Sequence, residues 1–451
     1  MFKKLFSIFL ILILFIGVFS FNSYAFTPTD FEVRAESALL VSLDNGQVLY
    51  EKAADEKRYP ASLTKIMTAL ILIENTKDLK TEKITVSKNA IECLLGTGSS
   101  LGGLKEGEVV TAEQMLYILL MSSANEGAEA IAEHYGGNRE GFVKLMNDKA
   151  AALGMKNTHF VNPHGLYDEN HYTTVNDMYK LVVEALKHPI FEEVVCCRRY
   201  DLAATNKNPA RTLTTTNLLM LAIYPEYYYK YAKGIKTGYT DEAGRCLIST
   251  AVKDGYSYLC ILMKSTVYDS NNNYVRYEFP DSAKLYEWAF NDFEYKTLVT
   301  KDKIVGEAKV ELSLDTDYVS YVPETAFASI IPSGVDESTV TFNTELNSDA
   351  FEAPIKKGEL LGKTDIIIAN EKIGEVNVVA ADTVERSMIL YIWKIIKDIF
   401  SSTAMKVVGL FLVSVVFIFV IICFIINNKK KKRRIKKYKR ITKRELDDYN
   451  K

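Results

Sequence analysis

The sequence has few of the residues that build metal centres and disulfide frameworks. Its 451 residues include five histidines, which never form His-Glu-x-x-His, and six cysteines at irregular spacing. Cys423 lies in a long apolar run, which leaves an odd number elsewhere, so we expect no disulfide framework. The adjacent Cys196 and Cys197 have no second cysteine pair at zinc-ligand spacing. We therefore expect no metal site and no cofactor.

The sequence also lacks the features of a nucleotide or nucleic-acid binder. A glycine-rich stretch at residues 96–103 is not closed by the Gly-Lys-Ser/Thr of a phosphate-binding loop. The formal net charge is only −2, although lysine and arginine crowd into the last residues after Asn428. The rest of the chain must then be net acidic, which argues against a nucleic-acid partner.

The N-terminus has the pattern of a secretory signal. Basic residues at 1–4 precede an apolar run from Leu5 to Phe21, and Ser23-Tyr24-Ala25 supplies the small residues of a cleavage site. We expect a signal peptide at residues 1–25, with an uncleaved membrane anchor as the alternative.

The other end of the chain predicts a membrane anchor. Residues 407–426 are uncharged and almost entirely apolar, and about 20 helical residues span a bilayer core. The basic tail at 427–451 predicts a cytoplasmic C-terminus and a contact with anionic lipid headgroups, so the preceding region would be extracytoplasmic. Residues 384–401 have amphipathic helical spacing with a tryptophan, which suits either the membrane interface or a helix leading into the span.

The most informative stretch is residues 59–68, which contain Ser62 and Lys65. Pro60 precedes an apolar pattern typical of a buried helix, at Ile66, Met67, Ala69, Leu70 and Ile73. Ser62 would lie in the first turn of that helix with Lys65 one turn further on the same face. A lysine amine could then activate the serine hydroxyl as a nucleophile. Alone, the pair could equally be a surface serine and lysine on a core helix.

Two further signals follow in the chain. A predicted helix at 112–121 ends before Ser123 and Asn125, and a second helix starts at once, so both side chains could project into a cleft; a simple helix cap is the alternative. Lys236-Thr237-Gly238 precedes two apolar strands and would lie on an edge strand whose backbone is free to pair with an extended peptide.

In this order and spacing, the three signals match the signature of penicillin-recognising acyl-serine enzymes. The chain resembles the low-molecular-mass penicillin-binding proteins that act as serine-type D-alanyl-D-alanine carboxypeptidases. Residues 100–107, 157–160 and 162–166 also resemble sequences of this family, and the resemblance continues to about residue 382. It implies an α+β fold in which a helical cluster packs on a five-stranded antiparallel sheet at 26–292, followed by a small all-β domain at 293–383.

The resemblance also implies roles for the first two motifs. Ser62 would attack the carbonyl of the D-Ala-D-Ala bond and form an acyl-enzyme. Lys65 would accept the proton, because burial and the charge of Lys236 would both lower the pKa of Lys65. Which group acts as the base in acylation is disputed across this superfamily. Ser123 would relay the proton to the departing amine, and Asn125 would hold Lys65 and the substrate amide.

The third motif would bind the substrate. Lys236 and Thr237 would hold the terminal carboxylate, and Gly238 would let the peptide come close to the strand. The backbone N–H groups of Ser62 and Tyr239 would form the oxyanion hole.

Three features depart from the family pattern. Glu126 stands where relatives usually carry aspartate. Many relatives have an arginine near 263–266 that helps to bind the substrate carboxylate; none is evident here, and Lys264 could substitute for it. Five tyrosines at 224–231 could stack on glycan sugars or form an aromatic surface loop.

We therefore expect a membrane-anchored carboxypeptidase that trims peptidoglycan pentapeptides and is acylated by β-lactams. One rival is a β-lactamase, although the Glu-x-x-Leu-Asn loop of class A enzymes is not found. Another is a catalytically weak relative that binds cell-wall peptide or scaffolds an assembly.

Overall fold

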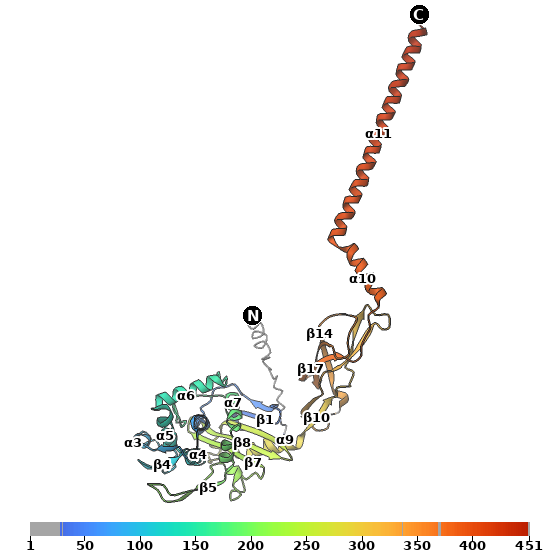
Figure 1. The fold of residues 1–451 in the computed structure, drawn as a ribbon. Helices are drawn as coiled ribbons and strands as arrows, with labels where there is room; N and C mark the ends of the chain where they lie inside the picture. The colour runs from blue at the N-terminus through green and yellow to red at the C-terminus, as the bar shows by residue number, and fades with distance from the viewer. Residues whose placement is uncertain (1–27, 29, 336, 369–370, 450–451) are drawn as a thin grey trace. The chain divides into compact units, whose positions relative to one another are not determined.

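The computed structural model describes residues 28–449 except 29, 336 and 369–370 (Figure 1). The expected signal peptide at 1–25 lies outside the described residues. The chain divides into two compact units, one made mainly of the residues up to Lys296 and one made mainly of the residues from Thr297. Each unit is described separately below.

The first unit is organised around a five-stranded sheet, as the resemblance implied. Its order is β2-β1-β9-β8-β7, and every neighbouring pair is antiparallel. The strands are β1 (Ala35–Ser42), β2 (Val48–Lys52), β7 (Ala232–Thr240), β8 (Gly244–Lys253) and β9 (Tyr256–Ser265). β7 lies at one edge, so the prediction that the Lys-Thr-Gly sequence occupies an edge strand is confirmed.

The alternation of side chains along the strands divides the core into two layers. On one face, Leu39, Ile248 and Ile261 pack with a cluster of helices. These helices are α2 (Lys65–Asn75), α4 (Ala112–Met121), α5 (Asn125–Gly136), α6 (Arg139–Ala152), α7 (Val175–Leu186) and α8 (Pro189–Cys196). On the other face, Leu40 and Leu262 pack against α9 (Glu278–Asp292). Each fully buried leucine or isoleucine contributes roughly 1.5–3 kcal/mol, so both faces stabilise the sheet.

Smaller elements connect this frame. Other elements of the first unit are η1 (Ala61–Thr64), α3 (Lys88–Glu92), η2 (Leu218–Met220) and two antiparallel pairs, β3 (Lys83–Thr85) with β4 (Val109–Thr111) and β5 (Arg199–Leu202) with β6 (Arg211–Thr214).

The tyrosine-rich segment at 224–231 is a surface loop, one of the two alternatives considered from the sequence, but not all of its rings are exposed. The ring of Tyr229 is buried and stacks on Tyr286 at 5.8 Å between centroids, and the Tyr227 ring lies 5.4 Å from that of Phe279. Tyr229 therefore belongs to the core layer beside α9, and Tyr227 and Tyr231 are partly buried against that layer.

The second unit is largely β structure. Six strands form a sheet in the order β14-β16-β17-β12-β11-β15. β10 (Phe293–Val299), which begins in the first unit, pairs with β13 (Phe327–Pro332), most of which also belongs to the first unit. The sheet strands are β11 (Gly306–Glu311), β12 (Tyr318–Pro323), β14 (Thr341–Leu346), β15 (Phe351–Glu352), β16 (Leu360–Ile368) and β17 (Glu371–Ala380). β14 follows the 3₁₀ turn η3 (Glu337–Thr339).

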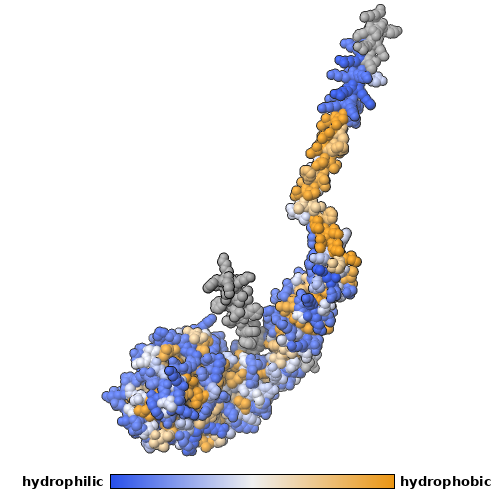
Figure 2. Space-filling view, in the orientation of Figure 1, coloured by the Kyte–Doolittle hydropathy of each residue, from blue (hydrophilic) through white to orange (hydrophobic). Residues whose placement is uncertain are grey.

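Two helices end the chain. α10 (Met388–Ser401) has exposed Ile392 and Trp393, in keeping with its amphipathic pattern. α11 (Thr403–Tyr449) contains a stretch, Thr403–Arg440, whose most apolar window has a mean hydropathy of 3.3 and which is long enough to cross a membrane. Figure 2 shows that the apolar residues of α11 give way to a hydrophilic end.

Candidate active site

The predicted Ser62–Lys65 pair is brought together at the start of α2. Ser62 lies in the 3₁₀ turn η1, and the α-helix itself begins at Lys65. Ser62 is therefore one turn ahead of the α-helix rather than inside it, but the Lys65 Nζ still lies 3.0 Å from the Ser62 Oγ. Lys65 is completely buried, whereas Ser62 is partly exposed.

The other partners of Lys65 determine where its lone pair points. The Nζ atom lies 2.6 Å from Asn125 Oδ1 and 2.9 Å from the backbone oxygen of His164. Both atoms only accept hydrogen bonds. A neutral amine has two hydrogens, which these acceptors occupy, so its lone pair faces the Ser62 hydroxyl. This arrangement lets Lys65 take the proton of the nucleophile.

Burial supplies the neutral amine that this step needs. It lowers the pKa of Lys65 well below its usual value, the charge of Lys236 lowers it further, and Glu126 opposes the shift. Burial also lowers the pKa of Lys236 to about 7. Two completely buried ammonium groups so close together are unfavourable, which favours the neutral form of Lys65.

Ser123 and Lys236 form the second half of the site. Ser123 lies between α4 and α5 in a left-handed conformation with φ of 56°, and it is 5% exposed. Its Oγ accepts a hydrogen bond of 3.0 Å from the Lys236 Nζ, which also donates to the Thr237 carbonyl oxygen at 2.8 Å. The hydroxyls of Thr237 and Thr216 lie 2.7 Å apart. Thus all three predicted motifs meet at one place.

Gly238 permits close packing of β7 on the Ser62 turn. A Cβ atom at Gly238 would lie 3.1 Å from the Pro60 carbonyl oxygen and 3.2 Å from the Ser62 backbone nitrogen. Within the described chain, no strand pairs with the outer edge of β7. Tyr239 follows on this edge with a half-exposed ring, and its hydroxyl donates to Asp241 at 2.6 Å.

Arg245 is a cationic side chain beside Tyr239 that the sequence analysis did not consider. It pairs with Tyr239 across β7 and β8, and its guanidinium carbon lies 4.1 Å from the centre of the Tyr239 ring. The buried Nε has no hydrogen-bond partner among the described residues. Lys264, the candidate considered from the sequence, instead forms a 3.0 Å ion pair with Glu36. A tight turn at 241–244 could have indicated this contact from the sequence, because such a turn places residue 245 opposite residue 239 on the neighbouring strand.

Glu126, which stands where relatives usually carry aspartate, holds the glycine-rich stretch in place. Its Oε1 accepts hydrogen bonds from the backbone nitrogens of Gly102 at 2.6 Å and Leu104 at 3.1 Å, and burial raises its pKa. The Asn125 backbone nitrogen donates to Ser100 at 3.0 Å. The glycine-rich stretch is therefore fixed beside Asn125, where the sequence analysis had only excluded a phosphate role.

Comparisons with known proteins show the family of this chain. A model of the D-alanyl-D-alanine carboxypeptidase family matches residues 24–266, and a model of the penicillin-binding protein 5 C-terminal domain matches 293–386. The D-alanyl-D-alanine carboxypeptidase DacF of Bacillus subtilis is 31% identical over 360 residues, covering 78% of this chain and 86% of the relative. DacA of Escherichia coli is 29% identical over 344 residues, covering 73% and 79%.

Solved structures support the fold. The chain is similar to penicillin binding protein 5 from Haemophilus influenzae with a TM-score of 0.59 and 25% identity, covering 80% of this chain and all of the other. It is also similar to the Streptomyces K15 DD-transpeptidase with a TM-score of 0.52 and 29% identity, covering 58% of this chain and 99% of the other. These matches confirm the family and the α+β fold class expected from the sequence.

Proposed function

We propose that this chain, which belongs to the D-alanyl-D-alanine carboxypeptidase family, is a serine enzyme that removes the terminal D-alanine from cell-wall pentapeptides through an acyl-enzyme on Ser62. The observation that carries the proposal is the set of contacts around Lys65, which directs a buried amine at the Ser62 hydroxyl. In the acylation step, the hydroxyl proton moves to Lys65 Nζ while Ser62 Oγ bonds to the scissile carbonyl carbon.

Breakdown of the tetrahedral intermediate needs an acid for the leaving group. The backbone N–H groups of Ser62 and Tyr239 hold the oxyanion, which is worth about 3 kcal/mol per donor in comparable enzymes. The bond to the amine nitrogen then breaks, and Ser123 passes a proton to that nitrogen, so that D-alanine leaves. The Ser123 Oγ takes a replacement proton from Lys65, the one that came from Ser62, while Lys236 keeps its own protons and holds Ser123 through a 3.0 Å hydrogen bond. Water then hydrolyses the ester and regenerates Ser62.

The edge of β7 provides the substrate site. An extended peptide pairs with its free backbone and approaches closely at Gly238. Lys236 and Thr237 bind the terminal carboxylate, and Arg245 adds positive charge beside Tyr239. Asn125 holds the substrate amide as well as Lys65. β-Lactams acylate the same serine, because their reactive carbonyl and carboxylate match this arrangement.

We infer a membrane location from the sequence patterns at the two ends of the chain. The signal peptide at 1–25 directs the catalytic region (26–292) and the all-β pedestal (293–383) outside the cytoplasm. The amphipathic segment (384–401) lies at the interface, residues 407–426 cross the bilayer, and the basic tail (427–451) stays cytoplasmic beside anionic lipids. Protease protection of the tail in inside-out and right-side-out vesicles tests this topology.

The activity is tested with the full chain in detergent micelles and a pentapeptide ending in D-Ala-D-Ala. We expect D-alanine release that is lost in Ser62→Ala while peptide binding remains. Binding without release by folded wild-type protein would favour the scaffold alternative. Rapid turnover of penicillin would favour the β-lactamase alternative.

A further inference from the structure

The third partner of Lys65 is a backbone carbonyl in an irregular loop. The loop, residues 162–166, contains neither helix nor strand, so no ladder of hydrogen bonds fixes its carbonyls. Asn162 closes the loop locally: its Oδ1 accepts from the Gly165 nitrogen at 2.6 Å, and its Nδ2 donates to the Leu166 oxygen at 2.9 Å. The direction of the His164 carbonyl nevertheless depends on how residue 164 itself is held.

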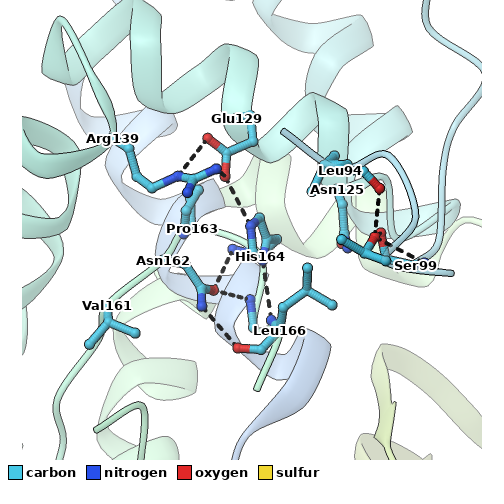
Figure 3. A network of polar contacts seen from close by, with 12 residues as sticks. Leu94, Ser99, Asn125, Glu129, Arg139, Val161, Asn162, Pro163, His164 and Leu166 are labelled. Atoms are coloured by element: carbon cyan, nitrogen blue, oxygen red, sulfur yellow. Dashed lines mark hydrogen bonds and ion pairs between the residues drawn. The ribbon is translucent and has the colours of Figure 1, made fainter. Parts of the chain in front are cut away.

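The His164 side chain is held from both sides (Figure 3). Its Nδ1 accepts a hydrogen bond of 3.2 Å from the Leu166 backbone nitrogen, so the ring hydrogen of the neutral form is on Nε2. That nitrogen lies 2.9 Å from Glu129 Oε1. Burial lowers the pKa of His164 despite the nearby Glu129, which keeps the ring neutral. The ring therefore carries its hydrogen on the nitrogen that faces the Glu129 carboxylate, 2.9 Å from Oε1.

Glu129 and Asn125 occupy the same face of α5, because they are four residues apart. One helix thus supplies both restraints on Lys65: Asn125 contacts the amine directly, and Glu129 reaches it through His164. Arg139 from α6 compensates the buried charge, with its Nε 3.1 Å from Glu129 Oε2 and its second terminal nitrogen 2.9 Å from Oε1. Burial alone would raise the pKa of Glu129, but His164 and Arg139 outweigh it and lower the pKa.

We propose that Glu129 is a positioning residue for the proton-transfer step. Its carboxylate fixes the His164 ring, and the ring fixes the peptide carbonyl that accepts one of the Lys65 hydrogens. With that carbonyl in place, the lone pair of Lys65 faces Ser62. The inference rests on the proposed acyl-serine function and adds to it a residue that touches neither substrate nor nucleophile.

A purely stabilising ion pair is the alternative, and the chain contains a matched control. Asp281 on α9 is as buried as Glu129, and its partner Arg34 is exposed to the same extent as Arg139, 38%. Both pairs have N–O distances of 2.9 Å. Asp281 packs on the face of the sheet opposite α5, so Asp281→Asn loses a similar ion pair without touching the Lys65 network.

The experiment separates binding from chemistry in the full chain, using a fluorescent penicillin. Stopped-flow acylation gives the dissociation constant of the initial complex and the first-order acylation rate. We expect Glu129→Ala and His164→Ala each to lower the acylation rate about 10- to 100-fold, because a 1 Å displacement of a catalytic group costs up to about 100-fold. The dissociation constant should stay within about twofold, since the carboxylate-binding residues are intact.

Two further variants make the result decisive. The double variant should be no slower than either single variant, because both residues act in series. Glu129→Gln preserves the shape but offers Arg139 a neutral amide, so its rate should fall less than that of Glu129→Ala. Glu129→Gln can also replace Glu129→Ala in the rate measurement if Glu129→Ala fails to fold. Asp281→Asn should lower thermal stability but leave the acylation rate unchanged.

The wild-type chain is measured first, which keeps the two claims apart. If it is not acylated at Ser62, the proposed function fails, whatever Glu129 does. If it is acylated, a folded Glu129→Ala or His164→Ala with the wild-type rate would overturn the positioning role. An equal loss of rate in Glu129→Gln and Asp281→Asn would overturn it as well, because general destabilisation would then explain both.

Discussion

Gly165 is the position where one methyl group should damage the site most. Its φ is +89°, and a Cβ atom there would lie 1.8 Å from the carbonyl oxygen of Ala61 and 2.8 Å from Thr64 Oγ1. Because real Cβ contacts are almost never below 3.0 Å, the loop and the Ser62 turn must separate by more than about 1 Å. Gly165→Ala would therefore move the nucleophile away from the loop that carries the His164 carbonyl.

Two effects add in this variant. An alanine in the left-handed region costs about 1–2 kcal/mol, and each kcal/mol lowers the Tm of a domain of this size by about 2–4 °C. The displacement costs further stability, and a shift of about 1 Å at a catalytic group lowers the rate about 100-fold. We therefore expect a Tm lower by several degrees and acylation slower by about two orders of magnitude.

The assay is penicillin acylation together with thermal unfolding, and Gly154→Ala is the control. Gly154 also has a positive φ, +68°, but its Cβ would meet no atom within 4 Å. Gly154→Ala should therefore show the backbone strain alone, with a modest loss of Tm and a normal acylation rate. A Gly165→Ala protein that acylates as fast as Gly154→Ala would refute the reasoning.

Three further predictions concern charge. Acylation should slow as the pH falls through the pKa of Lys65, because the protonated amine cannot accept the Ser62 proton. Lys236→Ala removes a charge that lowers this pKa, so the loss of rate should begin at a higher pH in the variant. A pH profile of the acylation rate of both proteins checks this. Burial lowers the pKa of His171 to about 3, below its unfolded value of 6.5, so its stabilisation is present above pH 6.5 and lost as the pH falls. Denaturant titrations should show about 2 kcal/mol lost at pH 5 from this group, and His171→Gln should remove that part of the pH dependence. Arg245→Gln should raise the KM for pentapeptide about tenfold or more by losing a charged contact, whereas Lys264→Gln should leave it unchanged; equal effects would contradict the assignment.

The sequence was most informative where spacing alone places residues. Ser62 and Lys65 are three residues apart on one helical segment, so their contact follows from local geometry. The helix at 112–121 was predicted with its observed bounds, because its apolar residues are continuous and Ser122–Ala124 interrupt them. The five-stranded sheet followed from the family resemblance, since strand pairing between distant segments is not readable from one sequence.

What the sequence could not provide were the partners contributed by distant loops. The His164 carbonyl reaches Lys65 across 99 positions in the chain, and no local pattern identifies a backbone atom as a site group. Arg245, on β8, was overlooked because a carboxylate-binding arginine was sought at 263–266, at the end of β9. The tyrosine-rich segment is the irregular loop that its composition indicated, but composition does not reveal that Tyr229 within it packs against Tyr286 of α9.

The most direct test of the central claim is to trap the acyl-enzyme during turnover of a pentapeptide ending in D-Ala-D-Ala. The full chain is quenched with acid at short times, D-alanine is quantified, and the digested protein is mapped by mass spectrometry. We predict released D-alanine together with a tetrapeptidyl ester on the peptide containing Ser62, and neither in Ser62→Ala. D-Alanine release that persists in Ser62→Ala, or an ester on another serine such as Ser123, would contradict the account.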